Sequence, residues 1–600
     1  MRNDSGPVPG VIIATDCGST TTKAILIEKK DGVYRQTCRG EAPTTVEAPF
    51  EDVTCGVRNA LAELETLSGR TLLRGGELIT PAAGGAGADL YVSTSSAGGG
   101  LQMLVAGAIL EMTGESARRC ALGAGAIVMD VLASNDCRAP HEKIEFIRQL
   151  RPDMILLSGG TEGGSVSHVL ELAQCIAAAD PLPRLGRGYK LPLVFAGNSD
   201  ARERVASILG EKTAFYEADN LRPSPERENL APARRKIHEI FLEHVMRQAP
   251  GYAKLAAMAR GAVLPTPAAA GIMVERFARA RSANVLAADI GGATTDVFSV
   301  FGGVFNRTVS ANLGMSYSAA NVLAEAGAEK ITRWLPFEMD ESDLRDRLKN
   351  KMIRPATIAQ TIEDLMIEHA VAREALRLAF EQHCRLATEI KGVGRERTIA
   401  DAFAQSAAGG IVDLVKLDYI IGSGGILARA PRRAQALLMM LDAFQPAGVT
   451  ALAVDSVFMM PQLGALAGVC ERAALDVFYN DCLVPLGVCI APLGSAPAGA
   501  PCLDYEMKFP GGETRRGAVP AGEIGLVPCA GPACVTLRPA RRFDLGAGMG
   551  RPVCVEAERG QAGFVLDGRG RPLVLETEPP VRRRQLNRWF RALALYPEHG

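Results

Sequence analysis

Short apolar runs separated by turn residues, alternating with longer stretches of helical spacing, make up most of this chain. Near the N-terminus, "IIATDCGSTTTKAIL" at 12–26 consists of an apolar run, an Asp-x-Gly turn rich in hydroxyl groups, and a second apolar run. "VLAADIGGATTDVFSV" at 285–300 repeats this pattern. Each stretch predicts two strands joined by a turn. We therefore expect the chain to build the same polar turn twice.

Alternating strand and helix patterns over the whole chain predict an α/β protein. The runs "AIVMDV", "DMILLSGG" and "LPLVFAGN" are separated by helical stretches, which is typical of a doubly wound parallel sheet. After residue 355, near-helical spacing predicts a helix whose core-facing residues are Ile358, Ile362, Leu365, Ala372 and Leu376. Gly and Pro punctuate short strands after about 475. The expected sections are 11–103, an inserted doubly wound domain at 104–222, a helical return at 223–284, 285–474, and a C-terminal β-rich module at 475–600.

The first turn carries groups that suit a polyphosphate. Asp16 ends a buried strand, and Gly18 lets the backbone approach a ligand closely. Phosphate oxygens need N–H and hydroxyl donors, and Mg²⁺ needs a nearby carboxylate, usually through water. Lys23 either reaches a phosphate or points outward from the second strand. The expected phosphate-binding residues are Gly18, Ser19, Thr20, Thr21, Thr22 and Lys23.

The second turn repeats this chemistry, with Asp289 before it and Asp296 after it. Its expected phosphate-binding residues are Gly291, Gly292, Thr294 and Thr295. One such turn is also compatible with an ordinary glycine-containing hairpin, but two turns in matching strand contexts favour a functional interpretation.

A third glycine-rich turn lies in "YIIGSGGILARA" at 419–430, between an apolar run and a predicted helix. Glycines at this place would let a nucleoside lie against the backbone at a helix N-terminus. A tight strand-to-helix turn without a ligand has the same pattern. The expected nucleoside-binding residues are Gly422, Ser423, Gly424 and Gly425.

Composition narrows the classes of partner. Lys+Arg 66 against Asp+Glu 67 gives a net charge of −1, which argues against electrostatic binding of nucleic acid or anionic lipid. No apolar stretch reaches the roughly 20 residues that a membrane span requires, and the N-terminus lacks the pattern of a secretion signal. The scattered cysteines form no paired framework. A cytoplasmic location is expected, while the oligomeric state is not predicted.

The order of two phosphate turns and a glycine-rich turn resembles the actin/Hsp70/sugar-kinase superfamily of ATPases. The resemblance implies two ribonuclease-H-like halves that bind Mg-ATP in the cleft between them, each half contributing one phosphate hairpin. It also implies that Asp16 and Asp289 lie near the hydrolytic water and near Mg²⁺, which they would hold through water. Asp296 would lie close by, and the glycines at 422–425 would bind the adenosine.

Several further segments resemble one family, the glutamate mutase accessory family, also called MutL. They include "APTTVEAPFEDVTCG", "STSSAGGGLQMLVAGAI", "RPDMILLSGGTEGG", "LPTPAA" and "DIGGATTDVFSV". The resemblance implies an ATP-dependent reactivating chaperone for an adenosylcobalamin-dependent mutase, releasing damaged cobalamin through ATP-driven domain motion. A small-molecule kinase on the same scaffold is the alternative, since Asp289 is also suited to act as a catalytic base.

The inserted domain leaves two interpretations open. Ser158, Gly159, Gly160 and Thr161 form either a small-ligand crevice of their own or a plain strand-to-helix turn. Direct cobalamin binding is not favoured, because the Asp-x-His-x-x-Gly signature of cobalamin-binding domains is absent from the sequence.

Overall fold

The computed structural model describes residues 9–18, 20–96, 100–184, 188–246, 250–386, 412–528, 531–557 and 560–597. The chain divides into two compact units that interleave along the sequence. The first unit contains residues up to Met273 and the segment Met460–Val477, and the second contains most of the remainder. Each unit is described by itself.

The first unit contains a five-stranded sheet with the order β12-β6-β1-β2-β3. Its strands are β1 (Val11–Cys17), β2 (Thr21–Lys30), β3 (Val33–Pro43), β6 (Leu90–Ser95) and β12 (Leu264–Pro265). β1, β2 and β3 are antiparallel neighbours, whereas β6 and β12 run parallel to β1. The central position of β1 explains its apolar sequence, because every residue from Ile12 to Cys17 is buried.

The second unit repeats this arrangement. The strands β13 (Val285–Ile290), β14 (Thr295–Phe301) and β15 (Val304–Ser310) form an antiparallel series, and β16 (Tyr419–Ser423) and β17 (Gly448–Asp455) continue parallel to β13. In both units the strands therefore have the order 3-2-1-4-5 with the same directions. This duplicated ribonuclease-H-like order confirms the fold class predicted from the two turns.

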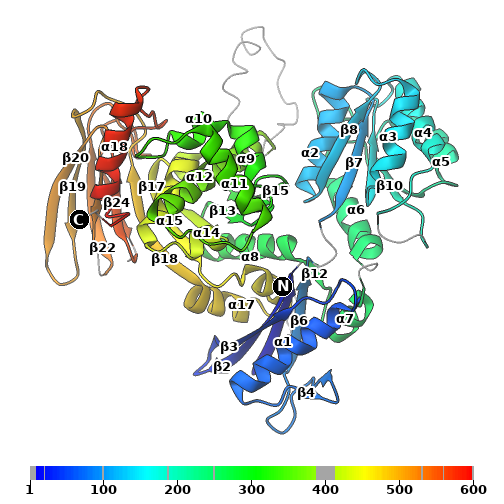
Figure 1. Ribbon diagram of the computed structural model, residues 1–600, viewed down its shortest axis with the longest axis horizontal. Helices are drawn as coiled ribbons and strands as arrows, with labels where there is room; N and C mark the ends of the chain where they lie inside the picture. The colour runs from blue at the N-terminus through cyan, green and yellow to red at the C-terminus, as the bar shows by residue number, and fades with distance from the viewer. Residues whose placement is uncertain are drawn as a thin grey trace. The chain divides into compact units, whose positions relative to one another are not determined.

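The inserted domain is a parallel sheet with the order β11-β10-β9-β7-β8 (Figure 1). Its strands are β7 (Gln102–Gly107), β8 (Ile127–Ala133), β9 (Met154–Ser158), β10 (Pro192–Phe195) and β11 (Ala214–Glu217). The helices α2 (Glu115–Gly123) and α6 (Ala231–Ile240) cover one face, and α3 (Pro140–Leu150), α4 (Ser167–Ala179) and α5 (Arg202–Leu209) cover the other. The predicted doubly wound domain is confirmed, although its expected start at 104 falls inside β7.

Other helices of the first unit cover its five-stranded sheet. α1 (Val53–Ser68) packs on β2 and β3, and a hydrogen bond from Thr54 N to the Asp52 carboxylate caps its first turn. α16 (Met460–Ala467) packs on β6 and β1, and α17 (Glu471–Val477) packs on β3. α7 (Tyr252–Met258) and α8 (Thr266–Arg281) lie between the inserted domain and β13 in sequence.

Helices between β15 and β16 enlarge the second unit. They are α9 (Ala319–Ala326), α10 (Ala328–Thr332), α11 (Glu341–Ile353) and α12 (Ile362–Leu386). Ala372 and Leu376 of α12 are fully buried, as predicted. The inclusion of Ile358 in this helix was wrong: Thr361 caps the helix start, with its Oγ1 accepting from Asp364 N, so Ile358 lies in the preceding loop and is exposed.

The section after 482 extends the sheet of the second unit, where the sequence predicts a separate module from 475. β18 (Leu483–Ala491), β24 (Gly563–Asp567) and β21 (Ile524–Val527) continue this sheet beyond β17. β19 (Pro501–Lys508), β20 (Thr514–Pro520), β22 (Ala533–Pro539) and β23 (Val553–Ala557) form a four-stranded sheet, and a shared apolar core packs it against β18 and β24. α18 (Pro579–Ala592) contributes buried Trp589 to the larger core.

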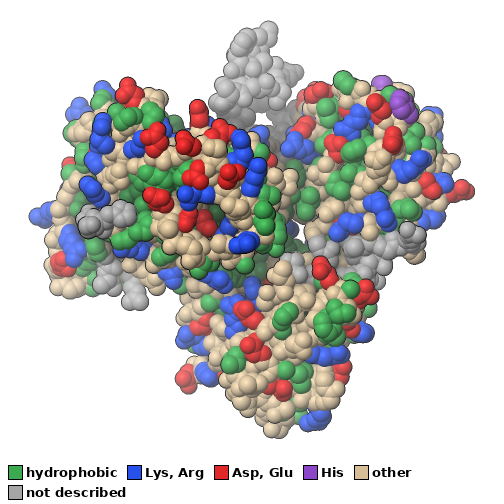
Figure 2. Space-filling model, viewed as in Figure 1, with side chains coloured by type: hydrophobic (Ala, Val, Ile, Leu, Met, Phe, Trp, Pro, Cys, Tyr) green, Lys and Arg blue, Asp and Glu red, His purple; other side chains and the backbone are tan. Residues whose placement is uncertain are grey.

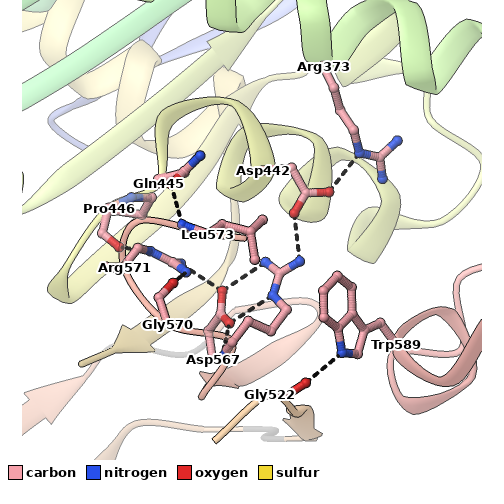
Figure 3. A network of polar contacts seen from close by, with 11 residues as sticks. Arg373, Asp442, Gln445, Pro446, Gly522, Asp567, Gly570, Arg571, Leu573 and Trp589 are labelled. Atoms are coloured by element: carbon pink, nitrogen blue, oxygen red, sulfur yellow. Dashed lines mark hydrogen bonds and ion pairs between the residues drawn. The ribbon is translucent and has the colours of Figure 1, made fainter. Parts of the chain in front are cut away.

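A buried ionic network joins this C-terminal section to the helices of the second unit (Figure 3). Arg569 donates two hydrogen bonds to the Asp567 carboxylate, both 2.8 Å, and one to Asp442 on α15 (Arg433–Phe444), 2.7 Å. Arg571 also donates to Asp567, and Arg373 of α12 donates to Asp442. All these side chains are buried, so each charge depends on its partners for stabilisation.

Outside such networks the surface charge is mixed. On the face shown in Figure 2, basic and acidic side chains are interspersed over each part of the chain. Among the described residues no helix is long and apolar enough to span a bilayer.

Candidate functional site

The first turn is a tight hairpin between β1 and β2. Gly18 N donates to Thr21 O at 3.1 Å, and a Cβ on Gly18 would lie 2.8 Å from that oxygen, so the turn requires glycine. Thr44 supports it from β3's end, with Oγ1 donating to Gly18 O at 2.9 Å. Thr20 is exposed, while Thr22 is buried and hydrogen-bonded to Thr44. Ser19 lies outside the described residues.

Asp16 is held beneath this turn by two hydroxyl groups. Its Oδ1 accepts hydrogen bonds from Thr94 Oγ1 at 2.7 Å and Thr266 Oγ1 at 2.6 Å. The residue is only 6% exposed. Burial raises the pKa of the carboxyl above its ordinary value, although the two threonines and the nearby Lys23 act in the opposite direction. A bound cation would stabilise this buried anion, so Asp16 fits the predicted role near Mg²⁺.

The second turn has the same backbone bond. Gly291 N donates to Thr294 O at 2.8 Å, as Gly18 does to Thr21. The segment after β15 supports the turn, with Met315 N donating to Gly291 O and Ser316 N to Gly292 O. A Cβ on Gly292 would lie 2.5 Å from Ser316 Oγ, so a larger residue here would have to displace this hydroxyl group. Thr295 Oγ1 donates to Leu313 O, and its side chain is fully buried.

The acidic residues of the second turn differ in their surroundings. Asp289 is half-buried and lies directly opposite Asp296 across β13 and β14. Asp296 forms an ion pair with Arg307 of β15 at 3.0 Å. Burial raises the pKa of Asp296, while Arg307 lowers it. The ion pair with Arg307 therefore compensates the buried charge of Asp296.

The two aspartates before the turns occupy equivalent positions in the two halves. Asp16 pairs with Lys23 on the second strand and with Thr94 on the fourth. Asp289 pairs with Asp296 on its second strand and with Ser423 on its fourth. Residues paired in this way present side chains on the same sheet face. The chain therefore builds two related polar sites from strands of the same order.

The glycine-rich turn after β16 lies against the end of β13, directly before the second Asp-x-Gly turn. A Cβ on Gly424 would lie 2.1 Å from Ile290 O, and its φ of +100° also favours glycine. Gly422 packs against Met440, where a Cβ would lie 2.7 Å from the sulfur. Around Gly425, by contrast, a Cβ would meet no atom within 4 Å. Only Gly425 of these three therefore has open space that a ligand could use.

These contacts predict that substitutions at the neighbouring residues Gly424 and Gly425 affect different properties, namely stability and nucleotide binding. Gly424→Ala forces a backbone clash and a strained φ, so we expect a loss of roughly 1–3 kcal/mol or more in unfolding free energy. Gly425→Ala is expected to leave stability within about 0.5 kcal/mol while weakening nucleotide binding, since its methyl group occupies the open space. Urea denaturation and nucleotide titration of both variants test this, and equal stabilities would contradict the packing argument.

The structure thus brings the second and third turns together within one unit. The first turn belongs to the other unit, and a cleft shared by all three stays a prediction. Sequence reasoning missed Thr94, Thr266 and Arg307, the partners of the buried carboxylates. Of these, Thr94 lies in the "STSSAGGGLQMLVAGAI" segment and Thr266 in the "LPTPAA" segment, both of which carry the family resemblance.

In the turn that follows β9 of the inserted domain, close packing explains the two glycines. A Cβ on Gly159 would lie 2.9 Å from Ala108 Cβ, and one on Gly160 would lie 2.9 Å from Ser165 O. The buried Ser158 Oγ has no hydrogen-bond partner in the described part of the chain. Both interpretations of this turn therefore stay open.

Two ribonuclease-H-like halves with equivalent Asp-x-Gly turns define the fold of the actin/Hsp70/sugar-kinase superfamily. Comparison with protein families then gives a specific result: the model of the MutL protein family matches residues 12–482, and the chain belongs to this family. Protein MutL from Clostridium tetanomorphum is 28% identical over 482 residues, which cover 75% of this chain and 95% of that protein. The resemblance of the sequence motifs is confirmed.

Solved structures give only weak overall superpositions. Xylulose kinase from Bifidobacterium adolescentis is 10% identical with a TM-score of 0.26, over 80% of this chain and 96% of that one. Component A of (R)-2-hydroxyglutaryl-CoA dehydratase from Acidaminococcus fermentans is 10% identical with a TM-score of 0.27, over 77% and 99%. The fold assignment rests instead on the strand order.

Proposed function

We propose that this protein binds and hydrolyses ATP and acts as a reactivating accessory protein for an adenosylcobalamin-dependent mutase. The observation that carries the nucleotide part is the equivalence of the two Asp-x-Gly turns in halves of identical strand order. The accessory role is supported by membership of the MutL family.

In this proposal the two turns hold the phosphate groups through backbone N–H and threonine hydroxyl groups. Asp16, whose Oδ1 accepts hydrogen bonds from Thr94 and Thr266, would hold Mg²⁺ through water. Asp289 would orient the attacking water, and the ion pair with Arg307 would hold Asp296 in place. Bound Mg-ATP supplies the transferable phosphoryl group, and Gly425 offers the nucleoside open space against the backbone.

The proposed Mg²⁺ site does not require a cluster of protein ligands. No group of three or more His, Cys, Asp or Glu suited to a metal ion occurs among the residues described. A cation held largely by phosphate oxygens and water, with one or two carboxylates, needs no such group.

Reactivation of a damaged mutase tests the proposed role directly. Glutamate mutase loaded with hydroxocobalamin is inactive, and we expect this protein with MgATP and free adenosylcobalamin to restore its activity, because cofactor release is coupled to nucleotide state. Activity is followed by product formation, with a non-hydrolysable ATP analogue as the control. Glutamate mutase and a second carbon-skeleton mutase are compared to identify the client.

Two outcomes would contradict the proposal. Failure to restore either mutase, while ATP is hydrolysed, would remove the accessory role but keep the ATPase. Transfer of phosphate to a small-molecule acceptor, in place of release as free phosphate, would support the kinase alternative.

A further inference from the structure

A cavity of about 590 Å³ lies between α11, the loop at 354–361 and the first turns of α12. Buried Leu348, Ile367 and Val371 form its apolar wall. At its edge, Ile353 and Ile358 are 76% and 73% exposed, although large apolar side chains are usually covered. The cavity therefore offers an apolar interior with an apolar rim.

The charges around the cavity are mostly neutralised by one another. Arg347 forms an ion pair with Asp364 at 2.6 Å, and Lys351 forms one with Glu368 at 2.8 Å. Arg354 is exposed and lines the cavity, and within the described contacts its side chain has no ion-pair partner. The net result is one uncompensated guanidinium beside an apolar space.

We propose that this cavity is a binding site for a small amphiphilic anion. Its volume lies in the range of about 300–1,000 Å³ that is typical of small-molecule sites. The apolar part of such a ligand would contact Leu348, Ile367 and Val371. Its carboxylate, sulfonate or phosphate would pair with Arg354, whose planar guanidinium suits bidentate binding of such groups.

This site is separate from the turns assigned to the nucleotide and does not depend on the proposed function. None of the residues 289–296 or 422–425 lines the cavity. Met315 does line it, and the Met315 N–H donates to Gly291 O at 3.0 Å. A ligand in the cavity therefore contacts the segment that supports the second turn.

Displacement of the fluorescent anion 8-anilinonaphthalene-1-sulfonate from the full chain tests this inference. Decanoate is compared with neutral decanol and cationic decyltrimethylammonium, which share its apolar chain. We expect decanoate to displace the dye at about tenfold lower concentration than decanol, a difference of about 1.4 kcal/mol. The cation is expected to bind most weakly.

Variants separate the charge from the apolar wall. Arg354→Gln should reduce decanoate binding about tenfold and leave decanol unchanged, whereas Arg345→Gln, on the preceding helix α11 and outside the cavity lining, should change neither. Val371→Trp should fill the cavity and abolish dye binding there. Ile358→Glu, at a position that is 73% exposed, should weaken decanoate binding by repulsion.

Three results would overturn the inference. Equal displacement by decanoate and decanol in the unmodified protein would remove the role of Arg354. Unchanged dye binding in both Val371→Trp and Ile358→Glu would place the dye elsewhere. Displacement by MgATP would assign the cavity to the nucleotide site.

Discussion

Asp16→Asn is expected to lower ATP hydrolysis by at least about 100-fold, the usual effect of removing one group that stabilises charge in a transition state. Asparagine keeps an Oδ1 that accepts from Thr94 and Thr266, so the local structure should persist. The neutral amide, however, cannot hold a hydrated cation as the carboxylate does. Phosphate release under saturating MgATP measures the effect.

The same variant is expected to be more stable than the unmodified protein without ligand at neutral pH. Burial raises the folded-state pKa of Asp16, so keeping this carboxyl ionised reduces stability at every pH above that pKa. As the pH falls through the folded-state pKa, Asp16 becomes protonated and the advantage of Asp16→Asn should shrink. Denaturation at several pH values from 8 downward, into the acid range in which the unmodified protein still folds, measures this difference.

Asp31→Asn is the matched control for both measurements. Asp31 is exposed in the turn between β2 and β3 with a φ of +52°, a conformation that asparagine adopts readily. We expect Asp31→Asn to change neither the rate of ATP hydrolysis nor the pH dependence of protein stability. Undiminished hydrolysis by Asp16→Asn would remove Asp16 from the site, and a pH-independent stability difference would contradict the role of burial.

Asp567→Asn is expected to destabilise the second unit by about 3–5 kcal/mol, the usual result of removing one partner of a buried ion pair. Arg569 and Arg571 would keep their charges in the interior without the carboxylate that they share. Urea denaturation at pH 7 gives the unfolding free energy. Asp504→Asn, at an exposed position of β19, is the control and should stay within about 0.5 kcal/mol of the unmodified protein.

The pH dependence of this effect has the opposite sign to that of Asp16. Burial by itself would raise the pKa of Asp567, but Arg569 and Arg571 hold it well below its ordinary value. Its stabilising contribution is therefore complete above the unfolded-state pKa of about 3.9 and is lost only in stronger acid. The loss measured for Asp567→Asn should be constant between pH 8 and 5, and a loss that falls over this range would contradict the argument.

Local patterns predicted the parts of the fold that depend on neighbouring residues. The two turns, their strands and the parallel sheet of the inserted domain are each encoded within short stretches of sequence. The two ribonuclease-H-like halves were expected from the superfamily resemblance that these turns carry, and the strand order confirms them. Ile358 shows the limit of such patterns: its spacing is helical, but the capping by Thr361 starts the helix after it.

Contacts between distant residues could not be predicted in this way. The hydroxyl groups on Asp16 come from 78 and 250 positions away, and Arg373 meets Asp442 across 69 positions. The same holds for the C-terminal strands, whose turn-rich sequence gave no sign that they would continue the sheet beyond β17. Which residues meet in these cases is decided by tertiary packing. Such packing produces no regular spacing that could be recognised in the sequence.

The interleaving of the two units has a practical consequence for dissecting this protein. The backbone passes from one unit to the other at 273–274 and again at both ends of Met460–Val477. A single proteolytic cut therefore cannot release either half as a complete fragment, and neither half can be expressed as one uninterrupted stretch of sequence. Any separation of the halves would require circular permutation or co-expression of several pieces.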